Sequence, residues 1–142
     1  MLLNLAPGAY TAIVRGKNGA TGIALVEVYD LDTSGVARLA NVSTRGRVGS
    51  GDNVLIGGLV ISGPAPKRII VRALGPSLAT FAVPGVLTDP MIELRDAIGQ
   101  LLATSDDWQS SAQTQEILAS RLAPADSREA ALPRGLRREP IR

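Results

Sequence analysis

The chain of 142 residues contains no cysteine and no histidine. Disulfide bonds are therefore impossible, and the usual zinc sites are excluded because they need thiolate or imidazole ligands. Catalytic triads of the Ser-His-Asp or Cys-His kind are excluded as well, because their general base is missing. What remains is the chemistry of carboxylates, lysine and tyrosine, and of Ca²⁺ held by oxygen ligands.

Aromatic residues are also scarce, at 3% of the chain, so the core must be built from Val, Ile, Leu and Ala. A hydrophobic share of 45% is typical of a globular protein, and the length suits one domain with one core. Fifteen glycines and nine prolines favour many short strands joined by tight turns.

Positive charge is concentrated at the end of the chain. Residues 134–142 contain four arginines and one glutamate, whereas the remainder is slightly acidic, so no nucleic-acid partner is expected for the domain. No run approaches the roughly 18 apolar residues of a transmembrane segment. The first five residues lack a basic region and a long apolar region, so we expect any secretion signal to lie elsewhere in a longer parent protein.

Alternating apolar and polar residues predict seven strands, at residues 9–15, 22–30, 40–47, 53–62, 67–74, 91–95 and 100–104. Asn18-Gly19 is typical of a tight turn, so the first two strands are expected to form a hairpin. An apolar stripe predicts one short helix near residues 111–122. The expected fold is mostly β: an antiparallel, jelly-roll-like β-sandwich with one short helix.

Several motifs resemble a repeat of large bacterial surface and secreted proteins. They are residues 5–16 (LAPGAYTAIVRG), 24–30 (ALVEVYD), 39–46 (LANVSTRG), 72–78 (RALGPSL) and 105–108 (SDDW). The resemblance implies a non-catalytic structural or adhesive module, outside the cell or on its surface, whose partners are neighbouring repeats of the same kind.

Residues 93–103, followed by Asp106 and Asp107, are similar to the bacterial pre-peptidase C-terminal domain, a small β-sandwich appended to secreted enzymes. This similarity implies the alternative function, an accessory module that binds carbohydrate or another extracellular polymer and is stabilised by calcium.

The two halves of the repeat occur in exchanged order. Residues 1–32 resemble the tail hairpin of one repeat and residues 36–132 most of the next, so residues 1–132 are expected to form one circularly permuted module. Residues 133–142 lack apolar alternation and are expected to be a disordered basic tail. If the first hairpin docks onto the rest, the sandwich is complete; otherwise an open sheet edge is expected to pair with another copy.

Asp96, Asp106 and Asp107 are the candidate metal ligands, with Ca²⁺ as the ion. The alternative is that these carboxylates accept hydrogen bonds from nearby backbone N–H groups in turns. Trp108 is the candidate ligand-binding residue, either as a platform on which a sugar stacks or as part of the core.

Catalytic residues are not expected. Glu27 and Glu93 could act as a carboxylate pair in glycoside hydrolysis, but nothing in the sequence places them together. The glycines between residues 46 and 51 lack the lysine of a phosphate-binding loop, and Ser77 lacks the flanking glycines of a nucleophile elbow. Both segments are interpreted as turns.

Overall fold

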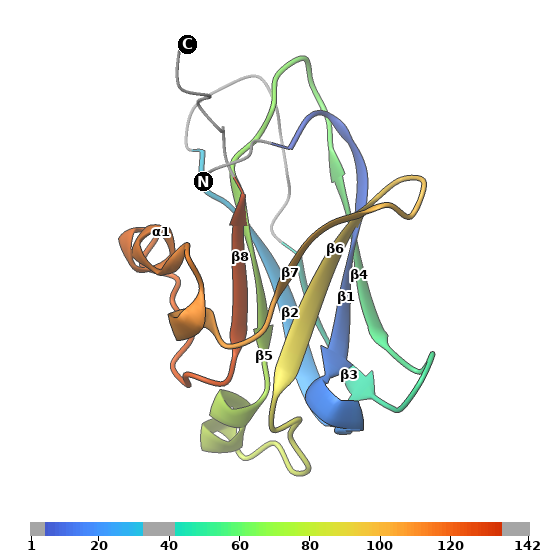
Figure 1. The fold of residues 1–142 in the computed structure, drawn as a ribbon, viewed down its shortest axis with the longest axis vertical. Helices are drawn as coiled ribbons and strands as arrows, with labels where there is room; N and C mark the ends of the chain where they lie inside the picture. Colours follow the sequence, from blue (N-terminus) through green and yellow to red (C-terminus); the bar gives the residue numbers. More distant parts are fainter. Residues whose placement is uncertain (1–4, 33–41, 135–142) are drawn as a thin grey trace.

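The computed structural model describes residues 5–32 and 42–134, which form two antiparallel four-stranded sheets packed face to face (Figure 1). The first sheet has the order β4-β1-β6-β7 and the second β3-β2-β5-β8. The strands are β1 (Gly8–Gly16), β2 (Gly22–Asp30), β3 (Val42–Val48), β4 (Leu55–Ile61), β5 (Ile69–Leu74), β6 (Pro90–Asp96), β7 (Leu101–Ser105) and β8 (Ala130–Arg134). The helices are α1 (Thr114–Ala119) and the 3₁₀ turns η1 (Lys17–Gly19), η2 (Pro76–Phe81) and η3 (Trp108–Ser110). The predicted β-sandwich with one short helix is confirmed.

The predicted hairpin between the first two strands is wrong. β1 pairs with β4 and β6, whereas β2 pairs with β3 and β5 in the other sheet. The turn has the expected backbone, with φ of 55° at Asn18 and 76° at Gly19. The chain uses this turn to cross between the sheets, and each arm becomes a central strand with two neighbours.

The main core lies between the sheets and is made of small and branched side chains, including Ala12 and Val14 of β1 and Ala24 and Val26 of β2. The sheets approach so closely that a Cβ atom at Gly57 would lie 3.1 Å from Cγ1 of Val26. A side chain at position 57 would therefore press on Val26 where the edge strand β4 passes over β2.

A second, smaller core lies on the outer face of the second sheet. Ile70 of β5 and Ala131 of β8 are covered there by Trp108 and Ile117, from η3 and α1. The helical segment is thus a third layer beside β8 (Figure 1). This cover explains why β5 carries buried apolar residues on both faces.

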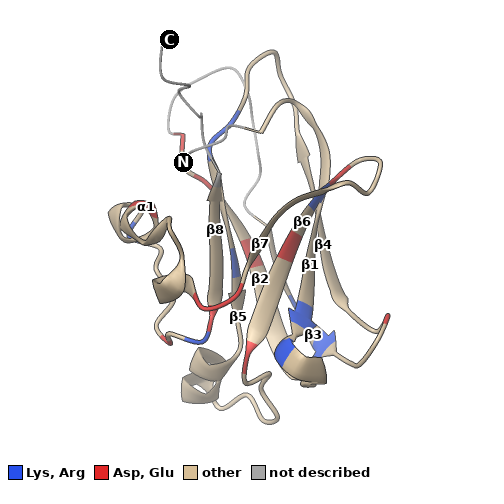
Figure 2. Cartoon of the chain, in the orientation of Figure 1, with Lys and Arg blue, Asp and Glu red and all other residues tan. Residues whose placement is uncertain are grey.

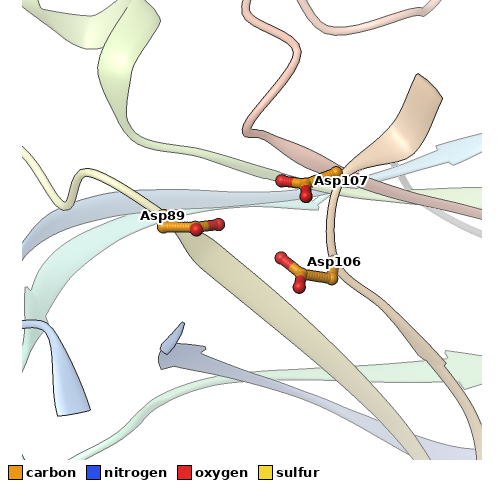
Figure 3. Close-up of side chains that lie close together, drawn as sticks. All are labelled: Asp89, Asp106 and Asp107. Carbon is orange, nitrogen blue, oxygen red and sulfur yellow. The ribbon is translucent and has the colours of Figure 1, made fainter. Parts of the chain in front are cut away.

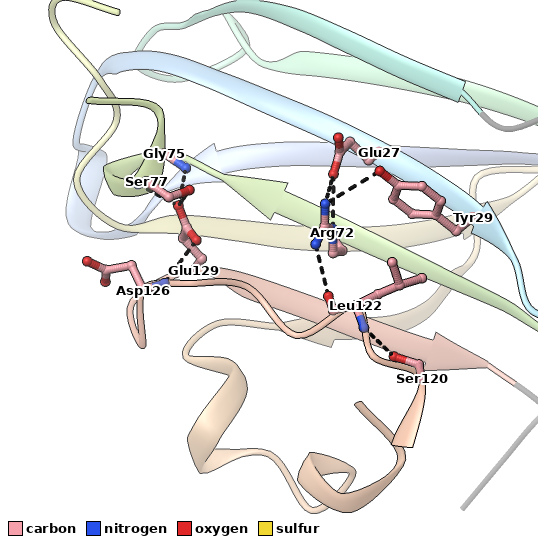
Figure 4. A network of polar contacts seen from close by, with 9 residues as sticks. All are labelled: Glu27, Tyr29, Arg72, Gly75, Ser77, Ser120, Leu122, Asp126 and Glu129. Carbon is pink, nitrogen blue, oxygen red and sulfur yellow. Dashed lines mark hydrogen bonds and ion pairs between the residues drawn. The ribbon is translucent and has the colours of Figure 1, made fainter. Parts of the chain in front are cut away.

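Arg72 ties this third layer to the sheet. Its guanidinium forms an ion pair with Glu27, donates a hydrogen bond of 3.0 Å to the carbonyl oxygen of Leu122, and lies 5.2 Å from the ring centroid of Tyr29 (Figure 4). Because both charged side chains are largely buried, the pair has little competition from water.

Glu129 fixes the turn after β5. Its fully buried carboxylate accepts hydrogen bonds from the N–H groups of Gly75 (3.0 Å) and Ser77 (2.8 Å) and from the Ser77 hydroxyl (2.5 Å) (Figure 4). The Gly-Pro-Ser motif is thus the anchored start of η2, which confirms its interpretation as a turn. Gly75 is required because a Cβ atom there would lie 2.0 Å from the carbonyl oxygen of Leu87.

β8 was not predicted as a strand. It pairs with β5 and includes Pro133 and Arg134, two residues beyond the boundary expected at 132. Residues 135–142, the rest of the predicted tail, lie outside the described residues. Within the part of the chain that the structure describes, no helix is long and apolar enough to cross a membrane.

We predict that Glu129→Ala lowers the free energy of unfolding by about 2–4 kcal/mol, because several buried or half-buried donors lose their acceptor. Urea denaturation measures this loss. The control is Asp52→Ala, which removes an exposed carboxylate and is expected to change stability by less than about 0.5 kcal/mol. Equal effects of the two substitutions would contradict the anchoring role of Glu129.

Candidate functional site

The structure gathers three carboxylates at one end of the sandwich: Asp89, Asp106 and Asp107 (Figure 3). One oxygen of each lies within 4.8 Å of the others. Asp89 immediately precedes β6, and the other two follow β7. Since β6 and β7 are antiparallel neighbours, the start of one lies beside the end of the other.

Lys17 closes the cluster from the crossing between β1 and β2. Its ammonium nitrogen lies 2.7 Å from Oδ2 of Asp106 and 3.9 Å from Oδ2 of Asp107. Its backbone N–H donates a hydrogen bond of 2.9 Å to the carbonyl oxygen of Asp89. Among the described residues, Lys17 faces all three carboxyl groups, and the guanidinium of Arg128, which is paired with Asp126, adds an electrostatic attraction to Asp89.

Burial raises the pKa of the Asp89 carboxyl, and the neighbouring Asp106 charge raises it further. Oδ1 of Asp89 and Oδ1 of Asp106 are buried, and neither has a hydrogen-bond donor among the described residues. Two carboxylates cannot bond to each other unless one holds a proton. A retained proton on Asp89 is thus one way to relieve the repulsion, and a bound cation is another.

The surroundings of the cluster are rich in oxygen atoms. Asp106 and Asp107 line an open hollow of about 220 Å³ together with Thr104, Ser110 and Ser111. Ca²⁺ takes six to eight oxygen ligands, so three carboxylates would need hydroxyl groups or water to complete its coordination. The residue types fit this ion better than a transition metal, because no imidazole or thiolate is present.

Asp96 does not belong to this site. It lies at the opposite end of β6, where its carboxylate accepts hydrogen bonds from the N–H groups of Ile98 (3.1 Å) and Gln100 (2.9 Å). The predicted trio of Asp96, Asp106 and Asp107 is therefore corrected: Asp89 takes the place of Asp96, whose role is that of a turn residue.

Trp108 lies beside the cluster in sequence but points into the second core. Only 6% of its surface is exposed, and its indole N–H donates a hydrogen bond of 3.1 Å to the carbonyl oxygen of Asp126. A sugar cannot stack on a buried ring, so the platform interpretation is overturned and the packing interpretation holds.

Glu27 and Glu93 lie in different sheets, on β2 and β6. Glu27 pairs with Arg72, and Glu93 pairs with Arg15 and Arg95. Burial alone would raise the pKa of Glu93, but hydrogen bonds from the two arginines outweigh it and hold that pKa below its ordinary value. The carboxylates cannot flank one glycosidic bond, so they form no hydrolytic pair.

No protein-family model matches the chain, and no curated protein or solved structure resembles it significantly. Over residues 5–32 and 42–134, the structure is an antiparallel β-sandwich of eight strands with one helical segment outside the second sheet.

We predict that Asp89→Asn raises the melting temperature by a few degrees near neutral pH. The raised pKa means that the folded chain holds this proton more tightly than the unfolded chain, so the carboxyl favours folding in acid. This contribution to the free energy of folding is lost as the pH rises through the folded-state pKa. The neutral amide of the variant carries no charge at any pH in this range, so the variant does not lose it.

The difference between the variant and the parent chain should shrink as the pH falls toward about 3, because the carboxyl is mostly protonated in both states only below the unfolded-state pKa of about 3.9. Thermal unfolding followed by circular dichroism across this range measures it. Asp52→Asn, at an exposed turn position, is the control and should show no such trend. A difference for Asp89→Asn that does not vary with pH would contradict the burial of its charge.

Proposed function

We propose that the chain is a non-catalytic structural or adhesive module of a bacterial secreted or cell-surface protein. The observation that carries the proposal is the placement of Glu27 and Glu93 in separate sheets, each paired with arginine. These two carboxylates are the candidate hydrolytic pair of the sequence analysis. In the structure each forms an ion pair with an arginine on a neighbouring strand. The location outside the cell and the neighbouring repeats as partners are supported by the sequence resemblance.

The interlocked fold supports a mechanical role. Each of the first two strands lies at the centre of a sheet, so force on this segment acts on β4 and β6 in one layer and on β3 and β5 in the other. Arg72 and Glu129 also fasten segments that are distant in the sequence. A module held by such long-range contacts can act as a rigid spacer.

The second candidate is a calcium-stabilised module that binds a polymer. The observation that favours calcium is the cluster of Asp89, Asp106 and Asp107, in which two buried oxygen atoms have no donor among the described residues. Lys17 supports the competing interpretation, in which a lysine and a retained proton balance the carboxylates without any metal. The burial of Trp108 counts against sugar stacking. In this second candidate, calcium therefore stabilises the fold and does not itself bind the sugar.

Thermal unfolding with Ca²⁺ and with chelator separates the two candidates. The structural module predicts no shift in melting temperature and no retention of the chain on insoluble cellulose, chitin or peptidoglycan. A calcium site predicts a shift that grows with the logarithm of the Ca²⁺ concentration above its Kd.

The matched variants are Asp106→Asn, which must abolish such a shift, and Asp96→Asn, which must leave it intact because Asp96 lies at the other end of β6. Specific retention on one polymer would overturn the purely structural role. Hydrolysis of any of these polymers by the purified chain would overturn the non-catalytic role.

A further inference from the structure

The edges of the two sheets differ in how they are protected. At one side of the sandwich, β8 contacts η3 and α1, and the Ala131 N–H of β8 donates a hydrogen bond to the Ser105 hydroxyl of β7. β7 is short, and its pairing with β6 shifts register between Leu94 and Arg95. At the other side, β3 carries the exposed charges of Arg45 and Arg47. The cover on β8, the register shift of β7 and the charges on β3 each disfavour pairing with a strand of another molecule.

β4 has none of these protections. Its seven residues, Leu55–Ile61, include no charged residue and no proline, and Figure 2 shows the strand without blue or red. Among the described residues it pairs with β1 alone, so its other edge offers unpaired backbone groups. Ile56 and Val60 on its outer face are 55% and 64% exposed. Open, apolar edges of this kind pair with other strands.

The sequence of β4 is complementary to itself. Gly58 lies midway between Ile56 and Val60 on the outer face, and nothing lies within 4 Å of a Cβ atom built there. An antiparallel copy centred on Gly58 places Ile56 opposite Val60 of the partner subunit. The apolar row then continues through Ile13, which is the partner of Ile56 on β1.

We infer that β4 of a second copy of this chain pairs antiparallel with β4 about a two-fold axis at Gly58, joining the two β4-β1-β6-β7 sheets into one eight-stranded sheet. The inference deepens the proposed function, because it rests on that function for the idea that the module contacts copies of itself. It names the strand and the register through which such copies meet.

Charge and area set the strength of this dimer. β3 lies over β4 in the second sheet, so Arg45 and Arg47 of the two subunits approach each other, and salt should strengthen association by screening them. A pair of seven-residue strands buries less than the roughly 1,200–2,000 Å² of standard interfaces. The dimer is therefore weak, and its population depends on protein concentration.

Disulfide trapping tests the register, since the chain has no cysteine of its own. Gly58→Cys places two thiols directly opposite each other, within the Cα separation of about 4.4–6.8 Å that a disulfide needs. Val60→Cys lies on the same face of the same strand, but its two copies would be offset by four residues, about 13 Å. With copper-phenanthroline as oxidant, Gly58→Cys should yield covalent dimer and Val60→Cys should not.

Sedimentation equilibrium of the uncrosslinked chain tests the association itself. Val60→Lys should raise the dimer dissociation constant by at least about tenfold, because it places a lysine at the edge in each subunit. Ile98→Lys is the control: Ile98 is 85% exposed in the turn between β6 and β7, and its substitution should leave association unchanged. Circular dichroism confirms that both variants remain folded.

A monomer at millimolar concentration and high salt would overturn the inference, as would equal crosslinking at positions 58 and 60. Neither result would bear on the proposal that the chain is non-catalytic, which the assays of polymer binding and hydrolysis test. Conversely, a dimer that crosslinks only at position 58 would stand even if those assays revealed an activity.

Discussion

The fold depends on the crossing between β1 and β2. Residues 16–21 carry the chain from the middle of one sheet to the middle of the other, and every other strand pairs with one of these two or with a neighbour of theirs. The small side chains of Ala12 and Ala24 let the layers meet at this centre. The same crossing supplies Lys17 to the carboxylate cluster, so the charge balance of that site and the path of the chain are linked. A module built this way gains rigidity from its first residues, in keeping with the proposed structural role.

Most of the strands could be predicted from residue alternation, because each has one face in the core and one outside. The pairing of the first two strands could not. Asn18-Gly19 has the same backbone preference whether the two arms hydrogen-bond to each other or enter opposite sheets, and only the tertiary structure decides. β8 does not follow from alternation, because residues 133–142 lack it and the expected module ends at residue 132. Pro133 is nevertheless tolerated in β8, which lies at the edge of its sheet.

The candidate site was half predictable. Asp106 and Asp107 were identified as ligand types, but Asp96 was grouped with them by nearness in sequence. The two strands expected at residues 91–95 and 100–104 pair antiparallel in the structure. The turn between them holds Asp96, whereas their other ends bring Asp89 beside Asp106. Strand register, rather than sequence distance, was the missed signal. The contribution of Lys17 depends on the pairing of β1 with β6, which alternation alone does not reveal.

Hydrogen exchange of the native chain tests the central position of β1 and β2 most directly. If these strands are the middle of both sheets, their ladder amides should exchange only through global unfolding, with the same free energy of opening as those of β5 and β6. That result would establish the two described sheets as one cooperative unit. Rapid exchange in β1 and β2 while β5 and β6 remain protected would contradict the account, because it would make the first two strands a loosely docked appendage of an independently stable sandwich.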